Sequence, residues 1–403
     1  MIKKIAVQQL VPGMFVHDMD CGWMEHPFLT GSFKVRSEND VGKMIGYGIQ
    51  EIYIDTERGL DLIGAPTQGE VESTITRQIA AIVQAPVSIE PATLHEEMAR
   101  ARLVLAEANK VIGDLMHSVR IGRQIEQEQV DHVVGKMSES ILRNKDALLS
   151  LCRIKEKDNY TFLHSVSVGA LLMCFTRAFN LKAGDMEQVG IGGMLHDIGK
   201  TMVPDRILNK PGDLTQDEFI TMQMHVVYGQ NILSDTPGIS QTSFDVVAQH
   251  HERYDGSGYP LKLKGSEMSI FGQMASIVDV YDAITSNRCY RKAMDPTVAL
   301  RKMFEWSKFH FDPQLIQAFV RTIGIYPVGT LVMLESSRIA VVIDQQGRDL
   351  TRPLVRAIFD AKKGCHITPK DIDLSLPLGQ GGGDRIIRHE AAAKWNIDPH
   401  QFI

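Results

Sequence analysis

The sequence lacks the features of a secreted, disulfide-stabilised or membrane-spanning chain. Its 403 residues include only five cysteines, and none of them forms a C-x-x-C pair. Scattered, odd-numbered cysteines are typical of reduced thiols in a cytosol. No apolar run approaches the roughly 20 residues that a bilayer span needs, and polar residues interrupt the N-terminal apolar stretch before a signal-peptide core can form. We therefore expect a cytoplasmic protein without a membrane span.

An excess of positive charge is also missing. The chain has 43 basic and 49 acidic residues, for a net charge of -6. Such a balance creates no general field that attracts duplex nucleic acid, so any nucleotide must be bound at a local site. Hydrophobic residues make up 44% of the chain, which is enough to bury a sizeable core.

What the sequence does contain is mostly helical periodicity. We predict a mainly α fold: a helical-bundle domain, a small N-terminal α+β module and a short β-rich C-terminal appendage. The expected divisions are a module over 1–64, a linker with connecting helices over 65–150, a helical domain over 151–325 and a β-rich extension over 326–403.

Local signals support these divisions. Thr93 and Glu96 form a capping box at the start of a long helical pattern, and a short helix is expected within the linker at 75–83. The glycine-rich run Gly379–Gly383 predicts a flexible tail at the end of the extension.

Histidines are concentrated in the helical domain. Five of the 14 histidines lie between positions 164 and 251, and two acidic residues lie in similarly apolar helical stretches. An isolated ionised carboxylate is costly to bury unless a cation or a hydrogen-bond network compensates it. A single such histidine would be an ordinary core residue, but together they indicate a site. The seven candidates are His164, His196, Asp197, His225, His250, His251 and Asp279.

The spacing of these residues predicts a metal site inside the bundle. The intervals are 32 residues from His164 to His196, 28 from Asp197 to His225, 25 from His225 to His250 and 28 from His251 to Asp279. Each interval fits one helix and its connection, so successive ligands can return to one point. Mixed imidazole and carboxylate ligands suit divalent transition metals such as iron, manganese or zinc, and argue against calcium or a thiolate cluster.

Seven ligands exceed what one ion with open positions requires, so two ions are expected. Asp197 can bridge them, with His164, His196 and Asp279 on one side and His225, His250 and His251 on the other. Two adjacent ions can hold a bridging hydroxide and neutralise phosphoryl oxygens. The pattern therefore favours phosphoester hydrolysis.

Cations and an aromatic ring surround the predicted metal site. Lys200 follows Asp197 by three residues, and the loop after His251 brings Arg253 and Tyr259 close to the metals. Arg288 and Arg291 lie beyond the Asp279 helix. Such cations can bind phosphate and the ring can stack on a base, although solvated surface positions are the ordinary alternative.

The order of these motifs resembles the HD-GYP family of the HD metallohydrolase superfamily. The similarity is carried by His196-Asp197 with Gly199-Lys200, and by His250-His251-Glu252 running into Gly258-Tyr259-Pro260, and it covers about residues 150–325. HD-GYP proteins are phosphodiesterases that convert cyclic di-GMP to linear pGpG and often to GMP. Residues 1–140 are similar to the regulatory module that frequently precedes this domain in bacterial proteins.

The resemblance implies roles for individual residues. All seven candidates would be metal ligands, Asp197 and Lys200 would be catalytic, and Tyr259, Arg288 and Arg291 would contact guanine and phosphate. Members with three metals carry a glutamate four residues before the first histidine, where this chain has Tyr160. Because a phenol is a poor third-site ligand, we expect two divalent ions, iron or manganese first among them.

Other functions remain as alternatives. The same pocket could serve a non-catalytic cyclic di-GMP receptor, a di-iron site could perform oxygen chemistry, and a generic nucleotidase could share the ligands. The complete ligand set and the surrounding cations favour a phosphodiesterase. A homodimer through the connecting helices and a signalling-protein partner at the GYP motif are further candidate interactions.

Overall fold

The computed structural model describes two compact units, residues 1–87 and 88–403. The described residues are 1–18, 32–46, 51–71, 91–153, 160–179, 181, 183–212, 214–286, 293–306, 309–345, 350–378 and 380–403. The helix expected at 75–83 and the arginines Arg288 and Arg291 lie outside these ranges. Among the described helices, none is both long enough and apolar enough to cross a membrane.

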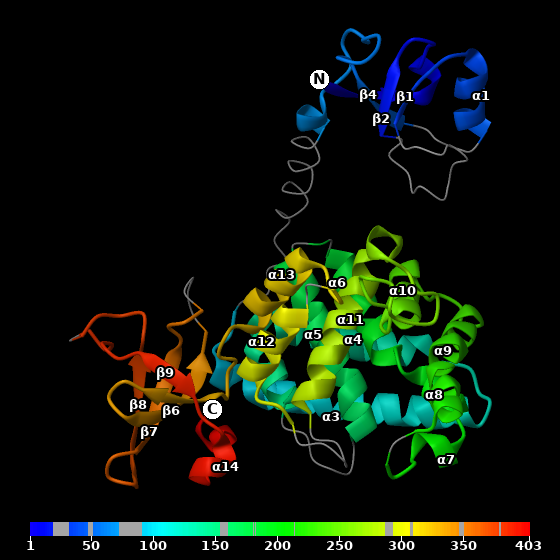
Figure 1. The fold of residues 1–403 in the computed structure, drawn as a ribbon. Helices are drawn as coiled ribbons and strands as arrows, with labels where there is room; N and C mark the ends of the chain where they lie inside the picture. Colours follow the sequence, from blue (N-terminus) through cyan, green and yellow to red (C-terminus); the bar gives the residue numbers. More distant parts are fainter. Residues whose placement is uncertain are drawn as a thin grey trace. The chain divides into compact units, whose positions relative to one another are not determined.

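The N-terminal unit is a small α+β module, as predicted. Its antiparallel sheet has the strand order β1-β4-β2-β3, and a short helix covers it (Figure 1). Met44 from the helix packs with Val16, Ile52 and Ile54 from the strands, and all four side chains are fully buried. The elements are β1 (Ile2–Ala6), η1 (Val7–Gln9), β2 (Phe15–Asp18), β3 (Phe33–Lys34), α1 (Glu38–Gly46) and β4 (Glu51–Asp55).

Two long helices open the second unit. They are α3 (Leu94–Arg120) and α4 (Gln127–Cys152), which pack along one another. The expected capping box is present, because the Thr93 backbone N–H donates to Glu96 over 2.8 Å and the Glu96 N–H donates to the Thr93 hydroxyl over 3.3 Å. The helical path of α4 breaks at Asn144, whose φ of -159° and ψ of 104° are extended.

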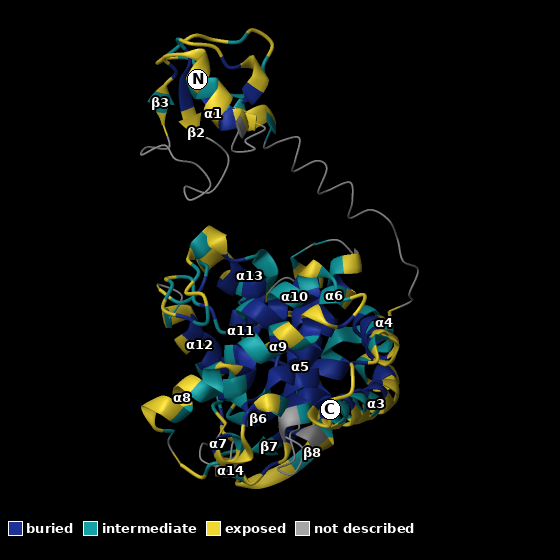
Figure 2. Cartoon of the chain, turned by 90° about the vertical axis from the view of Figure 1, so that its right-hand side faces the viewer, coloured by how far each residue is buried: buried dark blue, intermediate teal, exposed yellow. Residues whose placement is uncertain are grey.

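The helical domain surrounds two apolar helices, α5 and α11. Both lie among the buried elements in Figure 2. Helices α5 and α6 approach at glycines, since a Cβ on Gly193 would lie 2.7 Å from the Gly169 Cα. The helices are α5 (Tyr160–Ala178), α6 (Ala183–Leu195), η3 (Ile198–Met202), α7 (Asp205–Leu208), α8 (Gln216–Gln223), α9 (His225–Ser234), α10 (Gln241–Gln249), η4 (Gly265–Glu267), α11 (Ile270–Thr285), α12 (Pro296–Trp306) and α13 (Pro313–Ile323).

A five-stranded antiparallel sheet follows the helices, with the order β8-β7-β6-β5-β9. Both faces of the sheet carry buried apolar side chains. The elements are β5 (Leu331–Leu334), β6 (Arg338–Asp344), β7 (Leu354–Asp360), β8 (Cys365–Asp373), β9 (Ile386–His389), α14 (Ala392–Trp395) and η5 (Pro399–Phe402).

The end of the chain differs from the flexible tail that the glycine run predicts. Gly381 and Gly383 have φ values of 96° and 94°, which only glycine adopts readily. These glycines turn the chain back, so that β9 pairs with β5 and Ile397 is buried against the sheet. Gly381 and Gly383 therefore form a turn, and the chain after this turn is ordered.

Candidate metal centre

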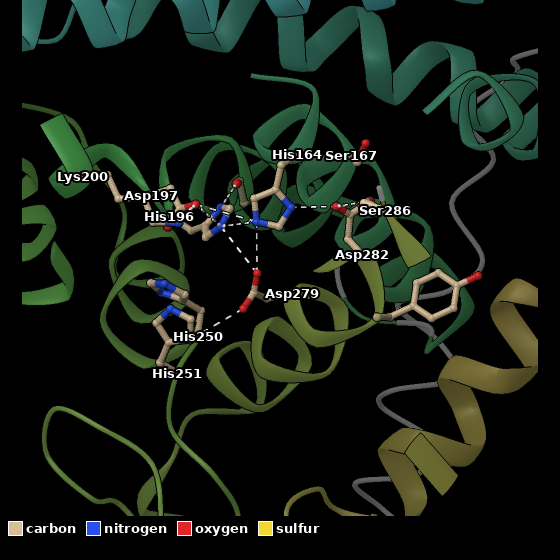
Figure 3. A network of polar contacts seen from close by, with 12 residues as sticks. His164, Ser167, His196, Asp197, Lys200, His250, His251, Asp279, Asp282 and Ser286 are labelled. Atoms are coloured by element: carbon tan, nitrogen blue, oxygen red, sulfur yellow. Dashed lines mark hydrogen bonds and ion pairs between the residues drawn. The ribbon is translucent and has the colours of Figure 1, made fainter. Parts of the chain in front are cut away.

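Seven side chains from separate parts of the helical domain meet at one point. His164 lies on α5 and Asp279 on α11, while His225 is the first residue of α9. His196 and Asp197 stand between α6 and η3, and the histidine pair 250 and 251 follows α10. Figure 3 shows the side chains of His164, His196, Asp197, His250, His251 and Asp279 pointing toward one another. The structure therefore brings together all seven residues that the spacing predicts as ligands.

The seven residues form overlapping groups of possible metal ligands. His164, His196 and Asp279 make one group, and His225, His250 and His251 make another. A third group, His196, Asp197 and His250, shares one histidine with each of them. The Asp197 carboxylate lies between the groups, with Oδ2 3.3 Å from His196 Nε2 and Oδ1 3.6 Å from His225 Nε2. Asp279 has a similar position, because its Oδ1 lies 3.2 Å from His164 Nε2 and its Oδ2 lies 3.6 Å from His251 Nδ1 (Figure 3).

Backbone carbonyls fix the tautomers of three histidines. The Nδ1 atoms of His196, His225 and His250 lie 2.7, 2.7 and 2.8 Å from the carbonyl oxygens three residues earlier. A carbonyl oxygen can only accept a hydrogen bond, so each Nδ1 carries the proton. The Nε2 atoms therefore point into the site with their lone pairs available.

This arrangement is unfavourable without a cation. The Nε2 atoms of His225 and His250 face one another at 3.3 Å, and those of His164 and His196 do the same. Asp197 Oδ1 is buried and has no hydrogen-bond partner among the described residues. Buried acceptors without donors are costly unless a positive charge lies between them. The donor set therefore fits divalent metal ions.

The protonation states also suit metal binding. Burial, reinforced by the charges of Lys200 and His196 respectively, lowers the pKa of His225 to about 4 and that of His250 to about 3. Burial raises the pKa of Asp197, but His196 and Lys200 outweigh it and hold that pKa well below its usual range. His225 and His250 are therefore neutral at pH 7 and lie in the same cluster as the ionised Asp197 carboxylate.

Two of the predicted substrate contacts, Lys200 and Tyr259, border this cluster. Lys200 Nζ lies 2.6 Å from Asp197 Oδ2. Tyr259 lies over His251, with ring centroids 4.7 Å apart. Arg253 donates to the Glu252 carbonyl over 2.8 Å and lies 5.9 Å from the Phe311 ring. The described residues thus place a cation and an aromatic ring beside the cluster.

Asp282 is a site residue that the sequence pattern did not single out. Its Oδ2 lies 2.6 Å from His164 Nδ1, and its side chain is buried (Figure 3). A carboxylate behind a metal-binding histidine fixes the ring and raises its basicity. The available signal was its spacing, since Asp282 follows Asp279 by three residues on one face of α11.

Comparisons with known proteins agree with this geometry. The HD domain family matches residues 136–315, and a domain of unknown function (DUF3391) matches residues 2–130. A cyclic di-GMP phosphodiesterase of Pseudomonas aeruginosa is 40% identical over 400 residues, covering 98% of this chain and 94% of that protein.

More distant relatives match parts of the chain. A cyclic di-GMP phosphodiesterase of Thermotoga maritima is 36% identical over 166 residues, covering 41% of this chain and 45% of its own length. A 3'3'-cGAMP-specific phosphodiesterase of Vibrio cholerae is 32% identical over 165 residues, covering 41% of this chain and 32% of its own. Relatives named for two different cyclic dinucleotides thus share sequence with this chain.

Proposed function

This chain belongs to the HD-GYP family of HD-domain phosphodiesterases, and we propose from that membership that it hydrolyses cyclic di-GMP with the aid of bound divalent metal ions. The observation that carries the proposal is the seven-residue cluster, in which two pairs of imidazole Nε2 atoms face one another at 3.3 Å. Cations between these nitrogen atoms would stabilise the cluster, and its neighbour Lys200 is a cation suited to phosphate.

The proposed ligands divide between two ions. His164, His196 and Asp279 would hold one, and His225, His250 and His251 the other. Asp197 would contact both, because its two oxygens face the two groups. Bound divalent ions activate water at neutral pH and neutralise phosphoryl oxygens.

The chain's own residues would then bind and orient the substrate. Lys200 would exchange part of its contact with Asp197 for a phosphate oxygen, where its charge stabilises the transition state. Arg253 and Tyr259 would contact phosphate and base at the loop. Arg288 and Arg291 are proposed as further guanine and phosphate contacts on the strength of the family resemblance.

The metal count is proposed as two per chain, with iron or manganese as the first candidates. Tyr160 stands where three-metal members have a glutamate, and a phenol binds hard divalent ions weakly. Elemental analysis of protein purified without chelator should give close to two ions per chain. Three tightly held ions would contradict this interpretation of Tyr160.

Product analysis tests the proposed reaction. Metal-loaded protein incubated with cyclic di-GMP should yield pGpG, GMP or both on chromatography, and removal of metal by chelation should stop the conversion. A parallel incubation with 3'3'-cGAMP measures the preference between cyclic dinucleotides. Tight binding of cyclic di-GMP without conversion would contradict the proposal and favour the receptor function.

Three further expectations stay predictions. They are a cytoplasmic location, a homodimer through α3 and α4, and a signalling-protein partner at the GYP motif. None of them is needed for the proposed chemistry.

A further inference from the structure

A buried carboxylate closes the loop that follows the histidine pair. This GYP loop, residues 252–260, begins at Glu252, whose side chain has no exposed surface. Glu252 Oε1 accepts the backbone N–H groups of Leu261 over 2.7 Å and Lys262 over 3.1 Å, and Oε2 accepts that of Leu263 over 3.1 Å. The first residue of the loop thus holds the three residues that follow its end.

The backbone of the loop also folds directly onto its own start. The Tyr259 N–H donates to the His251 carbonyl over 3.2 Å. A Cβ on Gly258 would lie 2.4 Å from the Arg253 nitrogen and 2.5 Å from the Glu252 Cα. Only glycine allows backbones to approach so closely. The Glu252 carboxylate and the absence of a side chain at Gly258 therefore both allow the loop to close on its own start.

The closed loop carries two of the proposed substrate contacts. Arg253 follows Glu252 directly, and Tyr259 lies two residues before the first N–H group that Glu252 accepts. Tyr259 is held over the His251 ring at a centroid distance of 4.7 Å. Movement of the loop end would therefore displace Tyr259 relative to the metal ligands.

We propose that Glu252 is a positioning residue that sets Arg253 and Tyr259 for the substrate by clamping the end of the GYP loop. The inference rests on the proposed function, since it concerns the same substrate. A carboxylate is required because both of its oxygens accept hydrogen bonds. Glutamine would turn an N–H₂ group toward a backbone N–H, and so would lose at least one bond while keeping its shape and volume.

Glu252→Gln tests the proposal, with Glu267→Gln as the matched control. Glu267 is an exposed glutamate that accepts one backbone N–H, from Lys264 over 2.7 Å, just beyond the same loop. The measurements are KM and kcat for cyclic di-GMP, metal content, and amide hydrogen exchange at Leu261, Lys262 and Leu263.

For Glu252→Gln we expect faster exchange at these amides and unchanged metal content. KM should rise about tenfold while kcat stays within about threefold, because the lost bonds position a ground-state binding loop. Glu267→Gln should leave KM and kcat as in the wild type.

Two results would overturn the inference. Faster exchange with an unchanged KM would show that the clamp does not position substrate contacts, and a loss of metal together with activity would show that Glu252 only supports His251. If the wild-type protein binds cyclic di-GMP but does not convert it, the proposed function fails separately. The dissociation constant of the intact nucleotide then replaces KM, and an unchanged value in Glu252→Gln would overturn the inference.

Discussion

At the scale of residues, the cluster is prepared for metal by groups that are not themselves ligands. Three backbone carbonyls hold the Nδ1 protons of His196, His225 and His250, and Asp282 holds His164. Each ring therefore presents its Nε2 to the site without a rearrangement. Removing a hydrogen-bond partner of a metal ligand typically lowers metal affinity or activity by about 10- to 100-fold.

Lys200 is expected to serve chemistry rather than metal binding. Replacing it in Lys200→Ala should lower kcat by roughly ten- to a hundredfold, as for the loss of one charge-assisted contact in the transition state, and leave metal content unchanged. Steady-state kinetics and metal analysis of the same sample measure both effects. Lys136→Ala is the control, since that lysine pairs with Glu107 on the connecting helices. A Lys200→Ala protein with wild-type kcat would show that Lys200 has no role in the chemical step.

At the scale of elements, the site depends on how closely η3 and α9 approach. A Cβ on Gly199 would lie 1.9 Å from the His225 carbonyl oxygen and 2.5 Å from the Gly229 nitrogen. The element that follows Asp197 and carries Lys200 therefore touches the backbone of the helix that begins at His225. We therefore expect this contact to influence the distance between the two ligand groups.

Gly199→Ala should consequently separate the two groups. We expect loss of bound metal and a destabilisation of about 1 to 3 kcal/mol, because the added methyl group must displace backbone rather than a flexible side chain. Gly135→Ala on α4 is the matched control, since nothing lies within 4 Å of its added Cβ, and it should stabilise the protein by about 0.5 to 1 kcal/mol. Metal analysis of both variants measures the loss of bound metal, and denaturant unfolding measures the change in stability. Normal metal content in Gly199→Ala would contradict this role of the contact.

The elements also show what a sequence pattern can and cannot predict. The convergence of His164, His225 and Asp279 was predicted from their spacing. One helix and its connection return the chain to the same point in the bundle, so ligands at such intervals can meet. The contact from Asp282 to His164 spans 118 positions and depends on side-chain direction, which periodicity does not contain. The clamp by Glu252 and the turn after Gly381 depend on backbone conformation in loops, where no repeating pattern exists.

At the scale of the whole molecule, the β-rich extension is attached to the helical domain within one compact unit. Arg153, after the end of α4, donates to the carbonyl of Val328 in the extension. Gln345 in the extension donates back to the carbonyl of Ile323, at the end of α13, over 2.9 Å. The sheet is therefore part of the same folded unit as the candidate metal centre.

Glu390 should make the unfolding free energy of this unit depend on pH in the acidic range. Its buried carboxylate accepts from Arg388, Lys394 and Trp395 over 2.7, 2.8 and 3.0 Å. Burial raises its pKa, but hydrogen bonds from Lys394, Trp395 and Arg388 outweigh it and lower the pKa from 4.5 to about 2. A lowered acid pKa stabilises the fold above the unfolded value and loses that contribution as pH falls from about 4.5 to about 2.

Glu390→Gln should therefore cost on the order of 2 kcal/mol of unfolding free energy at pH 6, and clearly less at pH 3. Urea unfolding at both pH values measures the difference from wild type, and metal ligands common to both proteins cancel in that difference. Glu335→Gln, which removes an exposed carboxylate paired with Arg385, should change stability little at either pH. An equal cost of Glu390→Gln at pH 6 and pH 3 would contradict the assignment.

The most direct test of metal-dependent hydrolysis is the turnover of cyclic di-GMP by Asp197→Ala, measured beside wild type with metal content and circular dichroism of the same samples. Asp197 faces both ligand groups, and the apolar side chains around it remain in the variant. We predict a folded protein that has lost metal and no longer converts cyclic di-GMP. A folded Asp197→Ala protein with near wild-type turnover would contradict the two-metal hydrolysis proposed for this site.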